Sequence, residues 1–183
     1  MLMNREELIF ELALPLNKKR INQFILQDLC DASDLIELST HSDSQIAFHA
    51  AWVLEYLIYD NPERFKGNYE RFVSVFEIQS NRSCQRHFTK ILMLLTESSN
   101  IHLLKDINLF TIVETSFALM IDSETPVAIT VNCMDILYNL RHLDSWIAEE
   151  LRLQVIHLLK DGTAAVQSRG KRVLKKLKNI ENN

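Results

Sequence analysis

One pattern of apolar positions recurs four times along the chain. Each copy places a β-branched residue directly before a leucine, and a second leucine follows three positions later. The copies begin at residues 53, 91, 136 and 173, so successive copies are 38, 45 and 37 residues apart. They read Val53-Leu54-Glu55-Tyr56-Leu57, Ile91-Leu92-Met93-Leu94-Leu95, Ile136-Leu137-Tyr138-Asn139-Leu140 and Val173-Leu174-Lys175-Lys176-Leu177. A near-regular period of this length is typical of stacked helical pairs.

Apolar or small residues also precede each of these four anchors at fixed distances. Seven positions before the anchors stand Ile46, Cys84, Ile129 and Val166, and three positions before them stand Ala50, Phe88, Cys133 and Gly170. At about 100° per residue, these positions and the anchor itself share about one third of a helix's circumference. Each anchor therefore predicts the buried stripe of an amphipathic helix. A further amphipathic segment precedes each one, so the predicted repeating unit is an antiparallel helix pair.

With this helix pairing and its [Val/Ile]-Leu-x-x-Leu anchors, the chain resembles the HEAT/armadillo families of helical repeats. The resemblance implies an all-α fold, a right-handed α-α superhelix of about four helical pairs. We expect a single domain over residues 1–183, in which residues 1–30 form capping helices at the amino end. The predicted repeat units cover residues 31–60, 68–97, 106–142 and 145–180.

The composition agrees with a helical, soluble protein. Of 183 residues, 47% are hydrophobic and 24% are charged, and only three glycines and three prolines are present. A sheet protein needs many tight turns, so this scarcity favours helices with short connections. The first residues lack the basic and apolar stretches of a signal peptide, and no run of about 20 apolar residues could span a membrane. Three widely spaced cysteines indicate buried, reduced thiols. We therefore expect a cytoplasmic protein.

Charge is distributed unevenly along the chain, whose net charge is −4. Residues 162–183 hold one acidic residue, Glu181, and six basic residues. These are Arg169, Lys171, Arg172, Lys175, Lys176 and Lys178. The end is therefore strongly basic and the remainder is acidic. Two interpretations stay open, a phosphate-binding face and a solvated helix end whose cations favour a C-terminus, and the second is favoured.

Beside the buried stripe lies a candidate binding surface. In helical solenoids the second helix of each pair commonly lines the concave binding face. Four positions in each unit, at −4, −1, +3 and +6 from the anchor, lie on one side of the core arc. They change from aromatic in the first unit to basic in the last. The predicted binding stripe consists of His49, Trp52, Tyr56, Tyr59, His87, Lys90, Asn132, Asp135, Asn139, His142, Arg169, Arg172 and Lys176.

Each member of the stripe also has a purely structural interpretation. Trp52 lies on an apolar helix and fits a core position as well as a stacking platform. His49 and His87 share one register position and could be neighbours, but two histidines supply only half of a metal site. Asp135 could form a surface ion pair with Lys90 or Arg172.

Motifs that carry catalysis are missing. The sequence has no His-Glu-x-x-His, no glycine-rich phosphate loop, no Gly-x-Ser-x-Gly and no Cys-x-x-Cys. We expect no catalytic residue, no metal and no cofactor. The favoured function is a non-catalytic adaptor or scaffold whose concave face binds a protein or peptide, with no membrane partner.

One enzymatic alternative remains. Bacterial DNA-alkylation-repair glycosylases are built from HEAT-like repeats and cradle DNA with basic, aromatic and acidic side chains. The resemblance implies corresponding residue types at Trp52, Tyr56, Lys90, Asp135, Arg169 and Arg172. The basic carboxy-terminal helix is the part that could contact nucleic acid. The acidic net charge opposes this alternative, because DNA affinity comes largely from cation–phosphate contacts.

Overall fold

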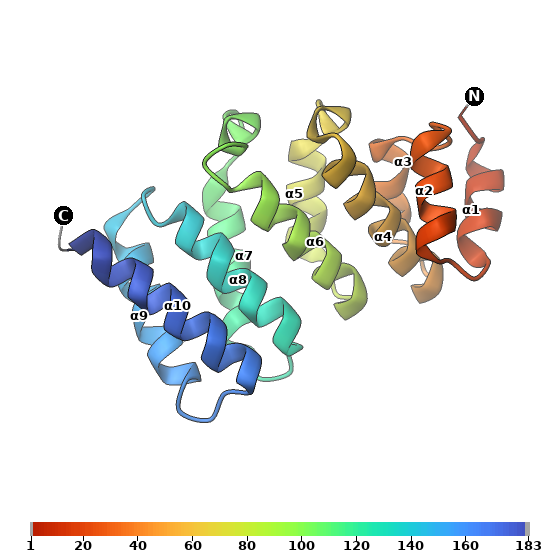
Figure 1. Cartoon of the computed structure of the whole chain (residues 1–183). Helices are drawn as coiled ribbons and strands as arrows, with labels where there is room; N and C mark the ends of the chain where they lie inside the picture. The colour runs from red at the N-terminus through yellow and green to blue at the C-terminus, as the bar shows by residue number, and fades with distance from the viewer. Residues whose placement is uncertain (1, 182–183) are drawn as a thin grey trace. The chain divides into compact units, whose positions relative to one another are not determined.

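The computed structural model of the protein describes residues 2–181, and this part of the chain is helical, without a strand. It contains ten α-helices and two short 3₁₀ helices (Figure 1). The α-helices are α1 (Arg5–Ala13), α2 (Lys18–Leu26), α3 (Ala32–Leu38), α4 (Ser44–Asp60), α5 (Tyr69–Ile78), α6 (Arg82–Leu95), α7 (Leu109–Ile121), α8 (Val127–Leu140), α9 (Ser145–Leu158) and α10 (Ala164–Glu181). The 3₁₀ helices are η1 (Pro62–Phe65) and η2 (Ile101–Leu104).

Short polar side chains start many of these helices. Asn4, Asn17, Asp31, Asp43 and Asp144 each accept a hydrogen bond from a backbone N–H in the first turn that follows. Such caps satisfy donors that the helix itself leaves unpaired, and each contributes about 1 kcal/mol. The connections can therefore be short without Gly-rich or Pro-rich loops. The connection before α5 does need a glycine. Gly67 has a φ of 84°, in the left-handed region where residues with a side chain are strained.

The chain divides into two compact units, Met1–Ile91 and Leu92–Asn183, and the division falls inside α6. In the first unit α4 is the central helix, and α1, α2 and α3 all pack against it. Phe72 of α5 stacks on Phe88 of α6, with ring centroids 4.5 Å apart. Both rings are fully buried, so this contact joins the second helix pair.

In the second unit α8 takes the central position, in contact with α7, α9 and α10. At Gly170, α10 lies close to the end of α9. A Cβ atom there would stand 3.0 Å from Val155 and 3.1 Å from Leu159. A larger residue would push the two helices apart, which explains why the anchor register contains a glycine at this point.

The four anchors predicted from the sequence all lie in the hydrophobic core. Their first residues, Val53, Ile91, Ile136 and Val173, are all fully buried. The apolar or small residues three and seven positions before them are buried as well. Of the anchor leucines only Leu174 is partly exposed. The all-α fold built from repeated helix pairs is thus confirmed.

The observed pairs are α3–α4, α5–α6, α7–α8 and α9–α10, preceded by α1 and α2. Residues 1, 182 and 183 of the predicted domain lie outside the described residues. The single-domain organisation and the handedness of the superhelix stay predictions. None of the helices between residues 2 and 181 has the length and hydropathy that crossing a membrane requires.

The three cysteines are buried free thiols. Burial raises the pKa of Cys30, Cys84 and Cys133 to about 12 in each case. At pH 8 only about one thiol in ten thousand is then the reactive thiolate. We expect iodoacetamide to leave all three unmodified in the folded protein and to alkylate them in urea. Mass spectrometry would check this, and rapid alkylation of any one without denaturant would contradict its burial.

Candidate functional site

The structure corrects the predicted exposure of the binding stripe at three positions. His49, His87 and Asn132 all stand at the −4 position of the register, and their exposed fractions are only 6%, 8% and 8%. His49 Nδ1 lies 2.7 Å from the carbonyl oxygen of Leu12 and ties α4 to α1. As folded, these three side chains have little surface to offer a partner.

The error has a physical cause. The prediction assumed that each second helix buries about one third of its circumference. In fact α4 packs against α1, α2, α3 and η1, and α8 packs against α7, α9 and α10, so both are buried on most sides. On these two helices the position that borders the core arc therefore lies beneath a neighbouring helix, and on α6 His87 lies against Glu55 of α4.

His87 belongs to a buried polar cluster that sequence reasoning missed. Glu55 of α4 is 5% exposed, and its Oε2 lies 2.5 Å from His87 Nδ1 on α6. Lys90, also on α6, forms an ion pair with the same carboxylate. Burial pushes the pKa of Glu55 up, but hydrogen bonds from His87 and Lys90 outweigh it and lower the pKa. The available signal was a single acidic residue among the apolar residues in the middle of α4.

Aromatic side chains surround this cluster. Trp52 is partly buried and stacks on Phe48, with ring centroids 5.6 Å apart, and on His87 at 6.2 Å. These contacts are internal packing, and a role for Trp52 as a stacking platform for a ligand stays a prediction. Tyr59 is 50% exposed, and its hydroxyl donates a hydrogen bond to the backbone carbonyl of Lys90 at 3.2 Å.

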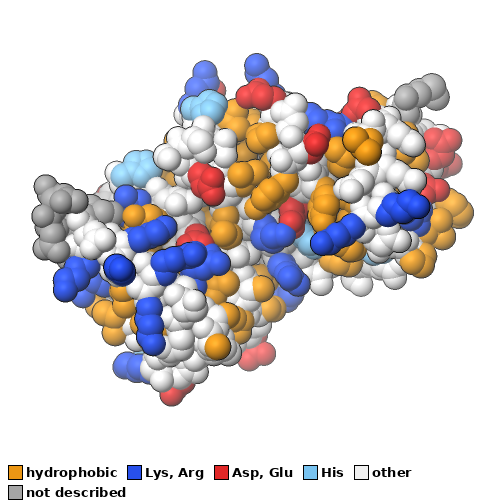
Figure 2. All heavy atoms as spheres, viewed as in Figure 1, with side chains coloured by type: hydrophobic (Ala, Val, Ile, Leu, Met, Phe, Trp, Pro, Cys, Tyr) orange, Lys and Arg blue, Asp and Glu red, His pale blue; other side chains and the backbone are white. Residues whose placement is uncertain are grey.

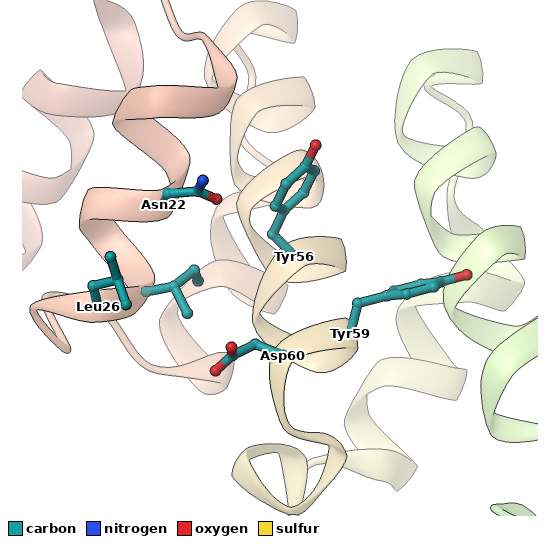
Figure 3. A pocket seen from close by; sticks show the side chains of 6 residues that line it. Asn22, Leu26, Tyr56, Tyr59 and Asp60 are labelled. Carbon is teal, nitrogen blue, oxygen red and sulfur yellow. The ribbon is translucent and has the colours of Figure 1, made fainter.

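Two aromatic residues of the stripe line a groove of about 390 Å³ between α2 and α4. Tyr56 and Tyr59 come from α4 and Leu26 from α2, and the Tyr59 ring points away from α2, toward α6 (Figure 3). Ile25 adds a further apolar side chain to the lining, and Asn22 and Asp60 add polar groups. Leu26 is 84% exposed, the largest fraction of any exposed large hydrophobic side chain among the described residues.

The charge beside this groove is negative. The Asp60 carboxylate lies 3.9 Å from Arg64, which also forms an ion pair with Asp28. Two exposed carboxylates thus share one guanidinium. No lysine or arginine is among the described residues that line the groove. Its surface is therefore aromatic and apolar with an acidic margin.

In the second unit the stripe is polar. Asp135 of α8 forms an ion pair with Arg169 of α10, and Arg172 Nη2 lies 3.4 Å from the same carboxylate oxygen. The predicted pair with Arg172 is thus present, whereas Lys90 pairs with Glu55 instead. Burial, and then the charge of Arg172, lower the pKa of Arg169.

The remaining stripe residues of this unit are also polar. The Asn139 amide donates to the hydroxyl of Thr96 at 3.1 Å. Lys176 Nζ lies 4.8 Å from the centre of the Tyr138 ring. His142 is exposed, and its Nδ1 lies 3.0 Å from the carbonyl oxygen of Asn139. Asp135, Asn139, Arg169, Arg172 and Lys176 share one groove of about 460 Å³.

Within residues 2–181 no group of three or more His, Cys, Asp or Glu side chains is arranged to hold a metal ion. Antiparallel helix pairs with buried anchors at near-regular spacing define a helical-repeat protein. A model of the HEAT repeat domain family matches residues 9–177. The protein belongs to this family, and the resemblance that its anchors indicated is confirmed. No curated protein and no solved structure matches the chain.

Proposed function

We propose that the protein is a non-catalytic scaffold that binds a segment of another protein in the groove between α2 and α4. The observation that carries the proposal is the combination of Leu26, Tyr56 and Tyr59 with the acidic Asp60. An apolar side chain as exposed as Leu26 gains free energy when a partner covers it, at about 25 cal/mol per Å² of apolar surface. Tyrosines supply rigid contact area at the edge of such a site.

The charge of the groove selects the class of partner. Proteins that bind single-stranded nucleic acid combine aromatic platforms with a positively charged groove. Here the aromatic residues stand beside Asp60, which would repel a phosphate backbone. The proposed partner segment therefore places an apolar side chain against Leu26 and Tyr56 and a basic side chain near Asp60.

Two matched variants test the proposal. Leu26→Asp puts a charge into the groove, and Ile78→Asp makes the same kind of change at a residue of α5 that is 73% exposed and outside the groove. Both native side chains are largely exposed, so both variants should fold, which circular dichroism and thermal melting would verify. Each protein would then capture partners from nuclease-treated lysate of the source organism.

The expected result is a protein partner whose recovery falls by about tenfold or more with Leu26→Asp, because burying a carboxylate against apolar groups is costly. Recovery with Ile78→Asp should match that of the wild type. Equal losses with both variants, or a partner that disappears after nuclease treatment, would overturn the proposal.

A further inference from the structure

A second groove, in the unit Leu92–Asn183, has the opposite chemistry to the groove between α2 and α4. Its walls come from the end of α6 and the residues that follow, from α8 and from α10. Arg169, Arg172 and Lys176 lie along one flank of α10, and Asp135 and Asn139 face them from α8. On the face seen in Figure 2, Lys and Arg side chains gather over α10. We call this site the α8–α10 groove.

The arginines of the α8–α10 groove are held in place. The Asp135 side chain is only 13% exposed and contacts both guanidinium groups. Arg169 is 25% exposed, and its contact with Asp135 fixes its orientation, whereas Arg172 is 54% exposed at a distance of 3.4 Å. One carboxylate neutralises one of the two positive charges. Together, Asp135, Arg169 and Arg172 therefore retain a net positive charge beside the open groove.

Lys176 provides a second cationic position, one turn further along α10. Its ammonium group stands over the Tyr138 ring, and Arg141 lies over the same ring at 4.1 Å. The aromatic ring orients Lys176 while leaving it exposed. Arg172 and Lys176 are separated by about 6 Å along the helix axis, at about 1.5 Å per residue. Two anionic groups with that spacing could be bound together.

The charge and the lining of this groove favour a peptide over a nucleic acid. In an extended peptide, side chains two residues apart project on one face about 6.6 Å from each other. Carboxylates in an acidic-x-acidic pattern would thus meet Arg172 and Lys176, and arginine binds carboxylates with paired hydrogen bonds. Glu97 and Asp135 also line the groove, so three cations stand against two acids. None of its described lining residues is an aromatic platform for a base.

We infer that the α8–α10 groove binds an acidic protein segment, with one carboxylate on Arg169 and Arg172 and a second on Lys176. This binding site extends the scaffold function to another surface. It does not depend on what the groove between α2 and α4 binds.

Peptide selection on the whole protein tests the inference. Peptides that bind the wild type would be selected from a displayed library of random dodecapeptides. Those that also bind the variant Arg172→Glu/Lys176→Glu would be removed. A fluorescent synthetic copy of a selected peptide would then be titrated by anisotropy. The matched control is Lys171→Glu/Lys175→Glu, which makes the same charge change at exposed residues of α10 outside the groove. Leu26→Asp serves as a second control, and circular dichroism verifies that each variant is folded.

The expected peptides carry two acidic residues separated by one position. Arg172→Glu/Lys176→Glu should weaken their binding by about tenfold or more, since hydrogen bonds to charged groups are strong. The control at Lys171 and Lys175 should stay within about twofold, because those contacts are solvent-screened. Leu26→Asp should leave binding of the acidic peptide unchanged. This result would show that the two grooves bind independently.

Three outcomes would overturn the inference. The first is a selection without acidic enrichment. The second is equal weakening by the two charge-reversed variants, which would indicate a general attraction to the basic helix. The third is displacement of the peptide by oligothymidylate at concentrations at or below those of the unlabelled peptide. That result would assign the α8–α10 groove to nucleic acid instead.

Discussion

Replacing Phe88 with alanine is expected to lower the free energy of unfolding by about 3–5 kcal/mol. The Phe88 ring is fully buried in α6 and stacks on Phe72 of α5, which in turn contacts Phe65 edge to face at 5.1 Å. Alanine would remove this ring and leave a cavity in the core. Urea unfolding followed by far-ultraviolet circular dichroism would measure the loss.

Phe110→Ala is the matched control. Phe110 is 39% exposed at the start of α7, so the same truncation should cost less than about 1 kcal/mol. A loss at Phe110 equal to that at Phe88 would contradict the assignment of the core.

Glu55→Ala is expected to have the second largest effect, a loss of about 3 kcal/mol at neutral pH. The substitution removes the acceptor of the buried His87 Nδ1 and the ion-pair partner of Lys90. Lys90 is 40% exposed and can turn to water, but His87 would be left in an enclosed site. Unfolding in urea again provides the measurement.

The contribution of the Glu55 charge to the free energy of unfolding should decrease as the pH falls. Hydrogen bonds from His87 and Lys90 hold the folded-state pKa of Glu55 below its unfolded value, against the effect of burial. The stabilisation is therefore fully present above the unfolded pKa of about 4.3 and is lost as the pH falls through the folded-state value. The stability difference between the wild type and Glu55→Gln should therefore narrow as the pH falls below about 5. A difference that widens with acid would contradict this account.

Sequence reasoning predicted the fold well because its evidence was periodic. The anchors at Val53, Ile91, Ile136 and Val173 each report which side of a helix is apolar, and burial of that side drives helix pairing. Even Gly170 fits, since a small residue is needed where α9 and α10 approach closely. These features depend only on one helix and its nearest partner.

The binding surface was harder to predict because exposure depends on all neighbours of a helix. The register places His49 and Tyr59 on the same flank of α4, yet α1 covers His49 while Tyr59 remains half exposed. Leu26 belongs to a helix outside the repeat pattern, so no register connects it with Tyr56. Glu55 was treated as a variable position, although packing against α6 makes it buried.

Photo-crosslinking from the groove between α2 and α4 tests the central proposal most directly. A photoreactive phenylalanine analogue would replace Leu26 in one protein and Ile78 in another, and both would be irradiated in cells of the source organism. A protein adduct is expected from position 26 and none from position 78. Its crosslinked segment should carry a basic residue next to an apolar one. Adducts of equal yield from both positions, or an adduct that nuclease removes, would contradict the account.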